Sequence, residues 1–188
     1  MCHRPTDPAN RGYEVTTPAP DSSNIATEAR AFLARFRTLL MATVSADGIP
    51  EASYAPFVRP DDNCFYVYVS ALSRHTGNLD INRRVSVLFI EDERDVKQLF
   101  ARTRLTFDCR AELIERESER WQTIMDMFQD TFGNVIELIR PLTDFKLFGL
   151  WPQSGIYVKG FAQAYRVSDA AIENVEHIRD ATGATKPA

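Results

Sequence analysis

The strict alternation of apolar and polar side chains over residues 103–115 constrains the fold more than any other feature of this sequence. Every second residue from Leu105 to Leu113 is apolar or a cysteine, and the residues between them are polar or charged. A period of two is the pattern of a β-strand with one buried face and one solvated face. The expected inward set is Leu105, Phe107, Cys109, Ala111 and Leu113. A half-buried strand needs partners, so the chain must build a sheet.

Shorter segments with the β-branched and aromatic composition of strands supply those partners. They cover residues 39–45, 51–58, 63–70, 85–91, 144–151 and 156–167. Asp47-Gly48 marks a turn after the first segment, and Pro56 favours an edge or a bulge for the second.

Helical patterns interrupt these strands without alternating regularly with them. Helices are predicted after Ser23 or Asn24, over residues 74–81, from Ser118, over residues 133–140 and from Ser168-Asp169. Irregular insertion argues against a doubly wound parallel sheet. We therefore predict a mainly β (α+β) fold, a six- to seven-stranded antiparallel barrel with flanking helices.

The chain of 188 residues fits one folded domain. Residues 1–22 contain four prolines and few large apolar residues, which predicts a disordered leader. The barrel domain is expected over residues 23–168. Residues 169–188 are expected to form a C-terminal helix and a flexible tail.

Charge and hydropathy exclude several classes of function. A net charge of −4 and a pI near 5.4 argue against nucleic acid as the main partner, because phosphate binding needs a basic face. No apolar run approaches the roughly 20 residues that span a bilayer, and no export signal opens the chain. These features predict a cytoplasmic protein without a membrane partner. The three cysteines form no CxxC pair and are expected to stay reduced.

The segment from Ser70 to Asn78 is the best candidate for a ligand site. A predicted strand ends at Ser70 and a helix starts near Ser73, so free backbone N–H groups meet hydroxyl, guanidinium and imidazole side chains there. This combination suits a phosphate or a propionate, because arginine binds an oxyanion through two parallel hydrogen bonds. The simpler interpretation is a capped surface turn. The candidate ligand-binding residues of the segment are Ser70, Ser73, Arg74, His75, Thr76 and Asn78.

Two further basic residues are candidates for the same site. Arg104 lies on the polar face of the long predicted strand, and Lys159 lies beside Gly160, which permits close approach to a ligand. The three histidines, His3, His75 and His177, have no spacing typical of a metal centre with several protein ligands. No motif of a serine hydrolase or a nucleoside triphosphatase is present either.

Six segments in order resemble the haem-utilisation proteins of the HugZ/HutZ type, which belong to the pyridoxamine 5′-phosphate oxidase-like, FMN-binding split-barrel superfamily. The segments are residues 42–58, 73–79, 83–92, 97–107, 144–148 and 155–165. The resemblance covers about residues 27–175. It implies a homodimer of split barrels with haem or FMN in the cleft between the subunits.

The resemblance also suggests roles for single residues. The flavin branch has an Arg-Lys pair where this chain has Arg74-His75, and a basic residue where this chain has the uncharged residues 53–56. The haem branch keeps the Arg-His pair, and its arginine on the long strand matches Arg104. Its aspartate matching Asp144 hydrogen-bonds the iron-bound histidine of the other subunit, which fixes the imidazole.

The position of the iron ligand itself falls near Thr182, which is not a normal haem ligand. Three possibilities follow: His177 substitutes as the iron ligand, His75 coordinates from the other face, or no histidine binds the iron. Three functions are correspondingly open. The chain is a haem-degrading oxidoreductase that releases iron, an FMN-dependent oxidoreductase, or a non-enzymatic haem carrier or store. No catalytic residue is identified.

Overall fold

The computed structural model describes residues 22–178. The predicted leader, except for Ser22, and tail residues 179–188, including Thr182, lie outside the described residues.

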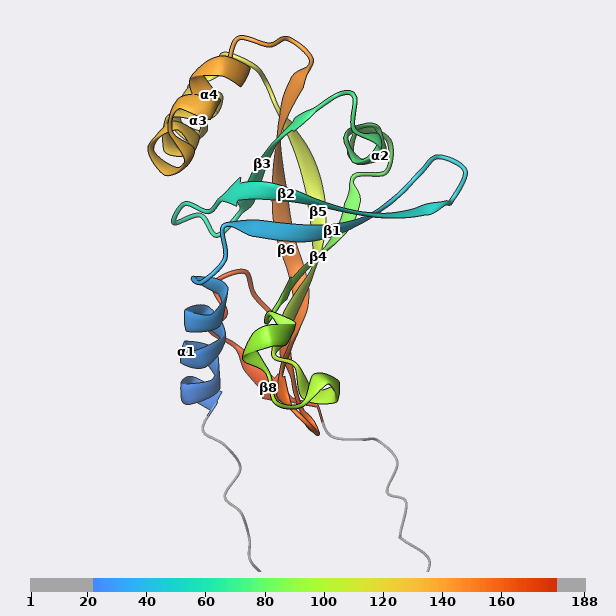
Figure 1. The fold of residues 1–188 in the computed structure, drawn as a ribbon, viewed down its shortest axis with the longest axis vertical. Helices are drawn as coiled ribbons and strands as arrows, with labels where there is room; N and C mark the ends of the chain where they lie inside the picture. Colours follow the sequence, from blue (N-terminus) through green and yellow to red (C-terminus); the bar gives the residue numbers. More distant parts are fainter. Residues whose placement is uncertain (1–21, 179–188) are drawn as a thin grey trace, which may run out of the picture.

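Six antiparallel strands close into a barrel (Figure 1). The strands are β1 (Thr38–Val44), β2 (Pro50–Val58), β3 (Phe65–Ser70), β4 (Arg84–Ile90), β5 (Arg104–Ile114) and β6 (Phe145–Gly160). Their order is β3-β2-β1-β4-β5-β6, and pairing of β3 with β6 closes the ring. β7 (Gln163–Val167) and β8 (Val175–His177) extend the sheet beyond β6. The predicted antiparallel split barrel with flanking helices is confirmed.

The barrel interior is filled by aromatic side chains from four strands. The rings of Phe57, Phe65, Phe89 and Phe107 are fully or almost fully buried, and neighbouring centroids lie 5.3–5.6 Å apart. Helix α1 (Ser22–Leu33) packs Ile25, Ala29 and Phe32 on the same core. Edge-on and tilted ring contacts of this kind add to the free energy gained by burying apolar area.

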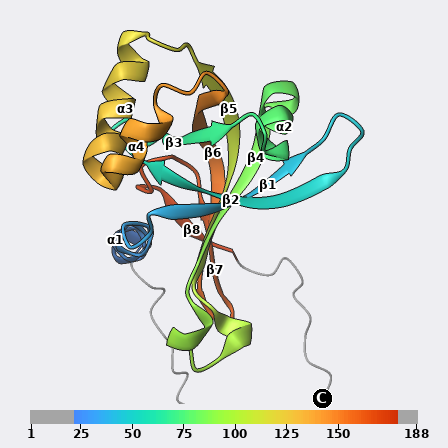
Figure 2. The ribbon, with the colours of Figure 1, turned by 45° about the horizontal axis from the view of Figure 1, so that its top comes forward.

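A second core lies on the outside of the barrel, under α3 (Glu119–Phe132) and α4 (Asn134–Ile139) (Figure 2). The helix predicted from Ser118 is confirmed, and Ser118 caps it by accepting a hydrogen bond from the Trp121 amide. Trp121, Ile124, Met125 and Phe128 face the strands at helical spacing. Because α3 covers their outer side, β3 residues Tyr66 and Tyr68 are also buried.

The structure corrects the strand pattern at two places. Leu113, expected in the core, is 44% exposed, whereas Ile114 is buried under α3, because the end of β5 contributes to the second core. The two strands expected over residues 144–151 and 156–167 are instead one long strand, β6, followed by β7. A register shift beside Cys109 lets β6 continue through Pro152, since a bulge tolerates a residue without an N–H.

The C-terminal helix expected from Ser168-Asp169 is wrong for the described residues. Val175–His177 is strand β8, which pairs with β7. Asp169 explains the difference, because its carboxylate accepts hydrogen bonds from the amides of Glu173 and Asn174 and turns the chain back along β7. The expected edge character of Pro56 is confirmed, since β2 pairs with β3 only through Phe57 and Val58.

Candidate functional site

The corner predicted from Ser70–Asn78 forms where β3 meets the beginning of β6. Ser70 pairs with Phe145, and its Oγ donates a hydrogen bond of 2.9 Å to Oδ2 of Asp144. The Ala71 amide donates to the Asp144 carbonyl at 2.7 Å. These contacts bring the exposed Asp144 carboxylate to the corner, although 74 positions separate it from Ser70 in the chain.

Two of the predicted ligand-binding residues hold the helix of this corner on the barrel. Helix α2 (Arg74–Asn82) starts after Ser73, whose backbone is extended and whose side chain forms no cap bond. The buried Thr76 donates through Oγ1 to the Ser70 carbonyl at 2.6 Å. The buried Asn78 donates to Thr43 Oγ1 at 3.0 Å. Thr76 and Asn78 therefore position α2.

Arg74 and His75 share a carboxylate neighbour on β2. Nε of Arg74 lies 3.3 Å from Oε2 of Glu51, and the Arg74 side chain is 71% exposed. The His75 residue is only 8% exposed. Burial lowers the pKa of His75, and the negative charge of Glu51 opposes this effect. His75 is therefore a neutral imidazole at pH 7, able to donate from one ring nitrogen and accept at the other.

These residues line an open hollow of about 540 Å³. Its walls come from β2, the end of β3, the start of α2 and the first residue of β6, and include Ser53, Tyr54, Pro56, Ser73 and Phe145. Arg74 and Glu51 are the charged residues among those that line it. The expected surplus of positive charge is therefore not supplied by one copy of the chain.

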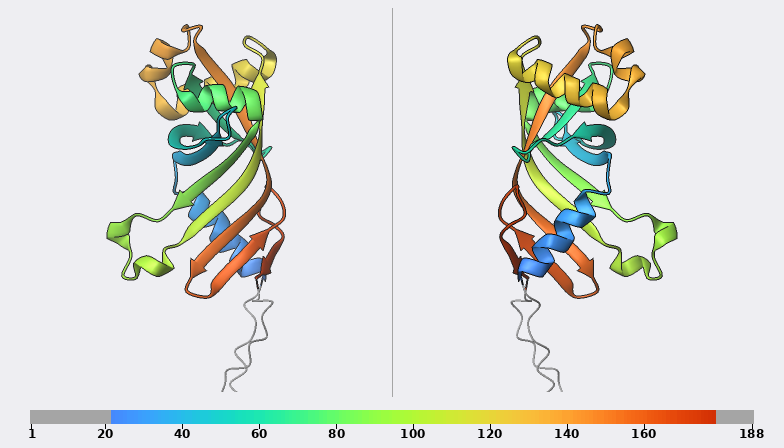
Figure 3. Two further views of the ribbon diagram at one scale, coloured as in Figure 1. Left: turned by 90° about the vertical axis from the view of Figure 1, so that its right-hand side faces the viewer. Right: turned by 90° about the vertical axis from the view of Figure 1, so that its left-hand side faces the viewer.

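The remaining predicted site residues belong to the start of β5, the end of β6 and β8, and these strand segments lie at the end of the barrel opposite α2 (Figures 1 and 3). Arg104 begins β5 and pairs with Ile90 and Val158. Ala111, where β5 passes the end of α2, is seven positions further along the strand, or roughly 23 Å. Within one copy, Arg104 therefore does not back the corner.

Lys159 and His177 lie near that lower end. The Lys159 ammonium group is 2.5 Å from Oε2 of Glu28 on α1, so its charge is already paired. His177 in β8 pairs with Tyr165 of β7, and the two rings meet edge to face with centroids 5.0 Å apart. Figure 1 shows β8 and α2 at opposite ends of the molecule. One copy therefore does not bring His177 to His75 or Asp144.

Sequence analysis missed an apolar surface on the outside of the barrel. Cross-strand pairing aligns one outward residue from each of five strands in a single row: Tyr54, Leu40, Leu88, Thr106 and Ile156. Tyr54 is 66%, Leu40 45% and Ile156 46% exposed. The next row holds small or short side chains: Ala52, Ala42, Ser86, Asp108 and Ser154. We call these two rows the outer barrel face. The sequence could have revealed this face, because Leu40, Leu88 and Ile156 are apolar residues at strand positions that face outward and are usually polar.

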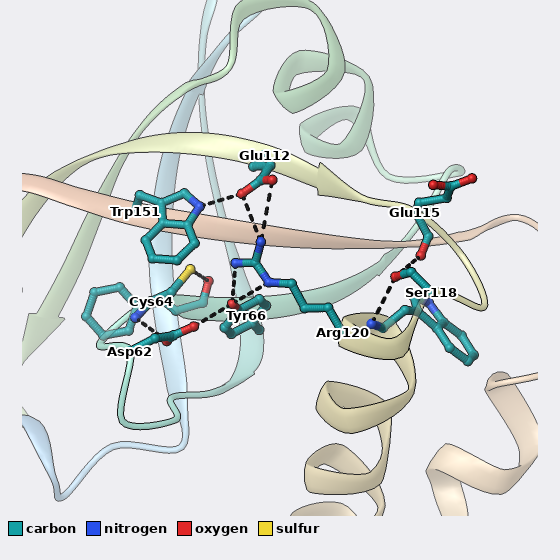
Figure 4. A network of polar contacts seen from close by, with 10 residues as sticks. Asp62, Cys64, Tyr66, Glu112, Glu115, Ser118, Arg120 and Trp151 are labelled. Atoms are coloured by element: carbon teal, nitrogen blue, oxygen red, sulfur yellow. Dashed lines mark hydrogen bonds and ion pairs between the residues drawn. The ribbon is translucent and has the colours of Figure 1, made fainter.

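A second polar group, under α3, has a structural role (Figure 4). The Arg120 guanidinium lies 5.3 Å from the Tyr66 ring centroid and 5.0 Å from that of Trp151. Nε of Arg120 donates to the Tyr66 hydroxyl at 3.0 Å, and that hydroxyl donates to Asp62 at 2.7 Å. Glu112 accepts from the Trp151 indole N–H at 2.8 Å. The group ties α3 to β3, β5 and β6.

The two cysteines among the described residues are buried thiols. Burial raises the pKa of Cys64 to about 12, and burial likewise raises the pKa of Cys109. Both remain protonated at neutral pH, so neither is an activated nucleophile.

Neither a membrane span nor a clustered metal site is evident in the described part of the chain. Over residues 22–178 no helix is long and apolar enough to cross a bilayer. The same residues bring together no group of three or more histidine, cysteine or carboxylate side chains that could hold a metal ion. The cytoplasmic location stays a prediction.

Comparisons with known proteins agree on one family. The profile described as pyridoxamine 5′-phosphate oxidase matches residues 25–159. The chain is 44% identical over 153 residues to the protein named haem oxygenase HutZ from Vibrio cholerae, covering 81% of this chain and 86% of that one.

Two solved structures are similar in sequence and in fold. HutZ of Vibrio cholerae, there described as a haem storage protein, is 45% identical with a TM-score of 0.67, and the match covers 72% of this chain and 94% of that one. ChuZ of Campylobacter jejuni is 34% identical with a TM-score of 0.76, and the match covers 88% of this chain and 67% of that one.

Proposed function

Because the chain belongs to the pyridoxamine 5′-phosphate oxidase family, in the branch that contains HutZ, we propose that it binds haem and serves haem utilisation. The relative named HutZ is described both as a haem oxygenase and as a haem storage protein. Haem binding is common to both descriptions, whereas only the first implies that the protein degrades haem.

The Ser70–Asp144 pair is the observation that carries this proposal. Asp144 is exposed, and one of its oxygens is held by the Ser70 hydroxyl. A carboxylate held in this way suits a partner that donates an N–H, as an iron-bound histidine does through its second ring nitrogen. Bound haem would supply iron for O₂ chemistry or would simply be stored. Ser70 and Asp144 would orient the imidazole and strengthen it as a ligand.

The residues around the hollow fit haem better than FMN. A phosphate with about two negative charges needs several cationic or N–H partners. Arg74 is instead paired with Glu51, and β2 residues Ser53, Tyr54 and Pro56 in the hollow are uncharged. Aromatic and proline side chains there suit the flat, apolar body of a porphyrin. FMN is therefore the less favoured of the two cofactors.

We propose that two copies of the chain build the complete site. Asp144, Arg74 and His75 lie at one end of the barrel, whereas Arg104 and His177 lie toward the other. The outer barrel face lies between these ends, and its exposed Leu40 and Ile156 suit burial against a second copy. A two-fold pairing that reverses one copy would place Arg104 of each beside the corner of the other. Arg104 would then supply the positive charge that the corner lacks.

Two histidines are candidates for the iron ligand. We propose that His177 of a second copy is the ligand, because Asp144 then has an imidazole to orient. His75 is the alternative within the same copy, since it is neutral and lines the hollow. Replacement of each in turn by alanine separates them.

The test is a titration of the purified protein with haemin and, separately, with FMN. We expect a shifted Soret band that saturates at one haem per chain, and no quenching of FMN fluorescence. Light scattering should report a dimer. In the His177→Ala variant the Soret band should change while haem still binds. If instead His177→Ala leaves the Soret band unchanged and His75→Ala changes it, His75 is the iron ligand. Absence of a saturable Soret shift would contradict haem binding.

Ascorbate and O₂ added to the haem complex, with catalase present, then decide whether haem is turned over. Loss of the Soret band with release of iron identifies a haem-degrading enzyme. A stable Soret band identifies a carrier or a store.

A further inference from the structure

A cavity of about 340 Å³ lies between α1, β2 and α3, away from the corner of Arg74 and His75. Its apolar lining includes Leu33, Phe36, Phe57 and Met127. Its volume is in the range of small-ligand sites, toward the lower limit. Nothing in the haem-binding proposal uses this cavity.

Three arginines, Arg30, Arg37 and Arg59, also line the cavity, and none of the described residues that line it carries a carboxylate. Arg30 and Arg37 are exposed and Arg59 is partly buried, so water screens part of their mutual repulsion. The described lining residues nevertheless carry three positive charges and no negative one. Asp62, which lies outside the lining, offsets the charge of Arg59 only in part.

The hydrogen bonds of these arginines fix their positions without neutralising them. Nη1 of Arg30 donates to the Ile172 carbonyl at 2.7 Å, and Nη2 of Arg59 donates to the Ala170 carbonyl at 2.7 Å. Arg37 donates to the Thr131 carbonyl and lies over the Phe132 ring at 5.1 Å. Within residues 22–178, none of the three forms an ion pair. They are held in place with their charges free for a ligand.

Arg59 supplies a second, independent sign of a missing partner. Its Nε is buried and donates to no acceptor among the described residues, which costs free energy in a folded protein. Burial lowers the pKa of Arg59, and the charge of Asp62 opposes this only in part. A bound anion would offset the cost of burying this cation.

We propose that this cavity binds a small organic anion. Its carboxylate or phosphate group would meet Arg30, Arg37 and Arg59, and its apolar part would lie against Phe36, Phe57 and Met127. Arginine suits both head groups, because its planar fork matches two oxygens of either. The site is separate from the haem site, so haem-free protein is the right material for its test.

Octanoate is the first probe, with octyl phosphate as the second anionic probe and octan-1-ol as the uncharged control. The readout is the methyl NMR spectrum of protein labelled at methionine. The sequence has four methionines, of which Met127 lines the cavity, whereas Met41 and Met125 are buried elsewhere. We expect octanoate to shift the Met127 methyl signal saturably and to leave Met41 unchanged. The anion that binds with the higher affinity shows whether the site prefers a carboxylate or a phosphate head group.

Arg37→Gln and Arg30→Gln should each weaken octanoate binding at least fivefold. Arg35→Gln is the matched control, because Arg35 is exposed beside Ala34 and Phe36 but does not line this cavity. It should change the affinity by less than twofold. The Met127 signal of the unsubstituted protein keeps the test valid where a variant fails to fold. Equal binding of octan-1-ol, equal weakening by Arg35→Gln, or an unmoved Met127 signal would overturn the proposal.

Discussion

Ser70 and Asp144 meet across the junction of β3 and β6, with Oγ of Ser70 2.9 Å from Oδ2 of Asp144. A second bond, from the Ala71 amide to the Asp144 carbonyl, fixes the backbone of the same residue. Asp144 is thus held twice by the strand end that also leads into Arg74 and His75. The carboxylate and the neutral imidazole of His75 form one corner, which is the basis of the haem-binding proposal.

Replacement of Asp144 tests this corner directly. We expect Asp144→Ala to weaken haem binding about 10- to 100-fold, the usual effect of losing a carboxylate that orients a metal-bound histidine. Ser70→Ala should have a smaller effect, since the backbone bond to Asp144 remains. The measurement is haemin titration followed by the Soret band. Asp126→Asn, on α3 and paired with Arg140, is the control and should bind haem normally; similar weakening there would refute the role of Asp144.

Replacement of Glu51 should strengthen the binding of an anionic ligand at the corner. Glu51 lies 3.3 Å from Nε of Arg74, so Glu51→Gln leaves the guanidinium without its anion. We expect haem affinity to rise severalfold and to become more sensitive to salt, because exposed charges are screened. The Arg74 side chain is 71% exposed, so loss of the ion pair itself should change stability little. The side-chain oxygen that Glu51→Gln retains can still accept the hydrogen bond from Asn78. A fall in haem affinity would show that Glu51 contacts the ligand favourably.

His75 should make the stability of the protein depend on pH in a defined window. Burial lowers its pKa below 6.5 in the folded state, so the unfolded chain binds the proton more readily. Stability is therefore unaffected above pH 6.5 and falls as the pH drops through the lowered pKa. Urea unfolding of haem-free protein at several pH values measures this slope. His75→Gln should reduce the slope, and an unchanged slope would assign it to other groups.

The outer barrel face predicts which substitutions separate the copies. Ile156→Glu should convert a dimer to a monomer, because it places a charge on an apolar row that the proposed dimer would bury. Light scattering after gel filtration measures the mass. Leu138→Glu is the control, since Leu138 on α4 is 74% exposed and lies outside both the face and the corner. A dimer that survives Ile156→Glu would show that the outer barrel face is not the interface.

Local pattern predicted most of the barrel. The alternation in residues 103–115 identified β5, and Ser118 identified the start of α3. Pattern failed where a strand meets a second layer, as at Leu113 and Ile114, because burial there depends on α3 rather than on the strand period. It also failed at residues 169–178, where side-chain bonds from Asp169 override a helical start.

The site was predictable only in part, for a similar reason. The run from Ser70 to Asn78 is local, and its strand–helix junction was recognised correctly. Whether Arg104 lies near that junction depends on the register and length of β5, which no local pattern contains. The Ser70–Asp144 contact depends on the pairing of β3 with β6, and only the family resemblance placed Asp144 at the site.

Two glycine-to-alanine substitutions should have opposite effects on stability. A Cβ added at Gly155 would lie 2.7 Å from the Thr106 carbonyl and 2.7 Å from the Phe107 ring, so Gly155→Ala should force β5 and β6 apart. We expect a loss of about 1–3 kcal/mol, as for other overpacked positions. Gly77 lies within α2 with nothing within 4 Å of an added Cβ, so Gly77→Ala should stabilise the protein by about 0.5–1 kcal/mol. Urea unfolding of both variants measures the two changes in stability. An unchanged free energy of unfolding for Gly155→Ala would mean that β5 and β6 separate here at little cost.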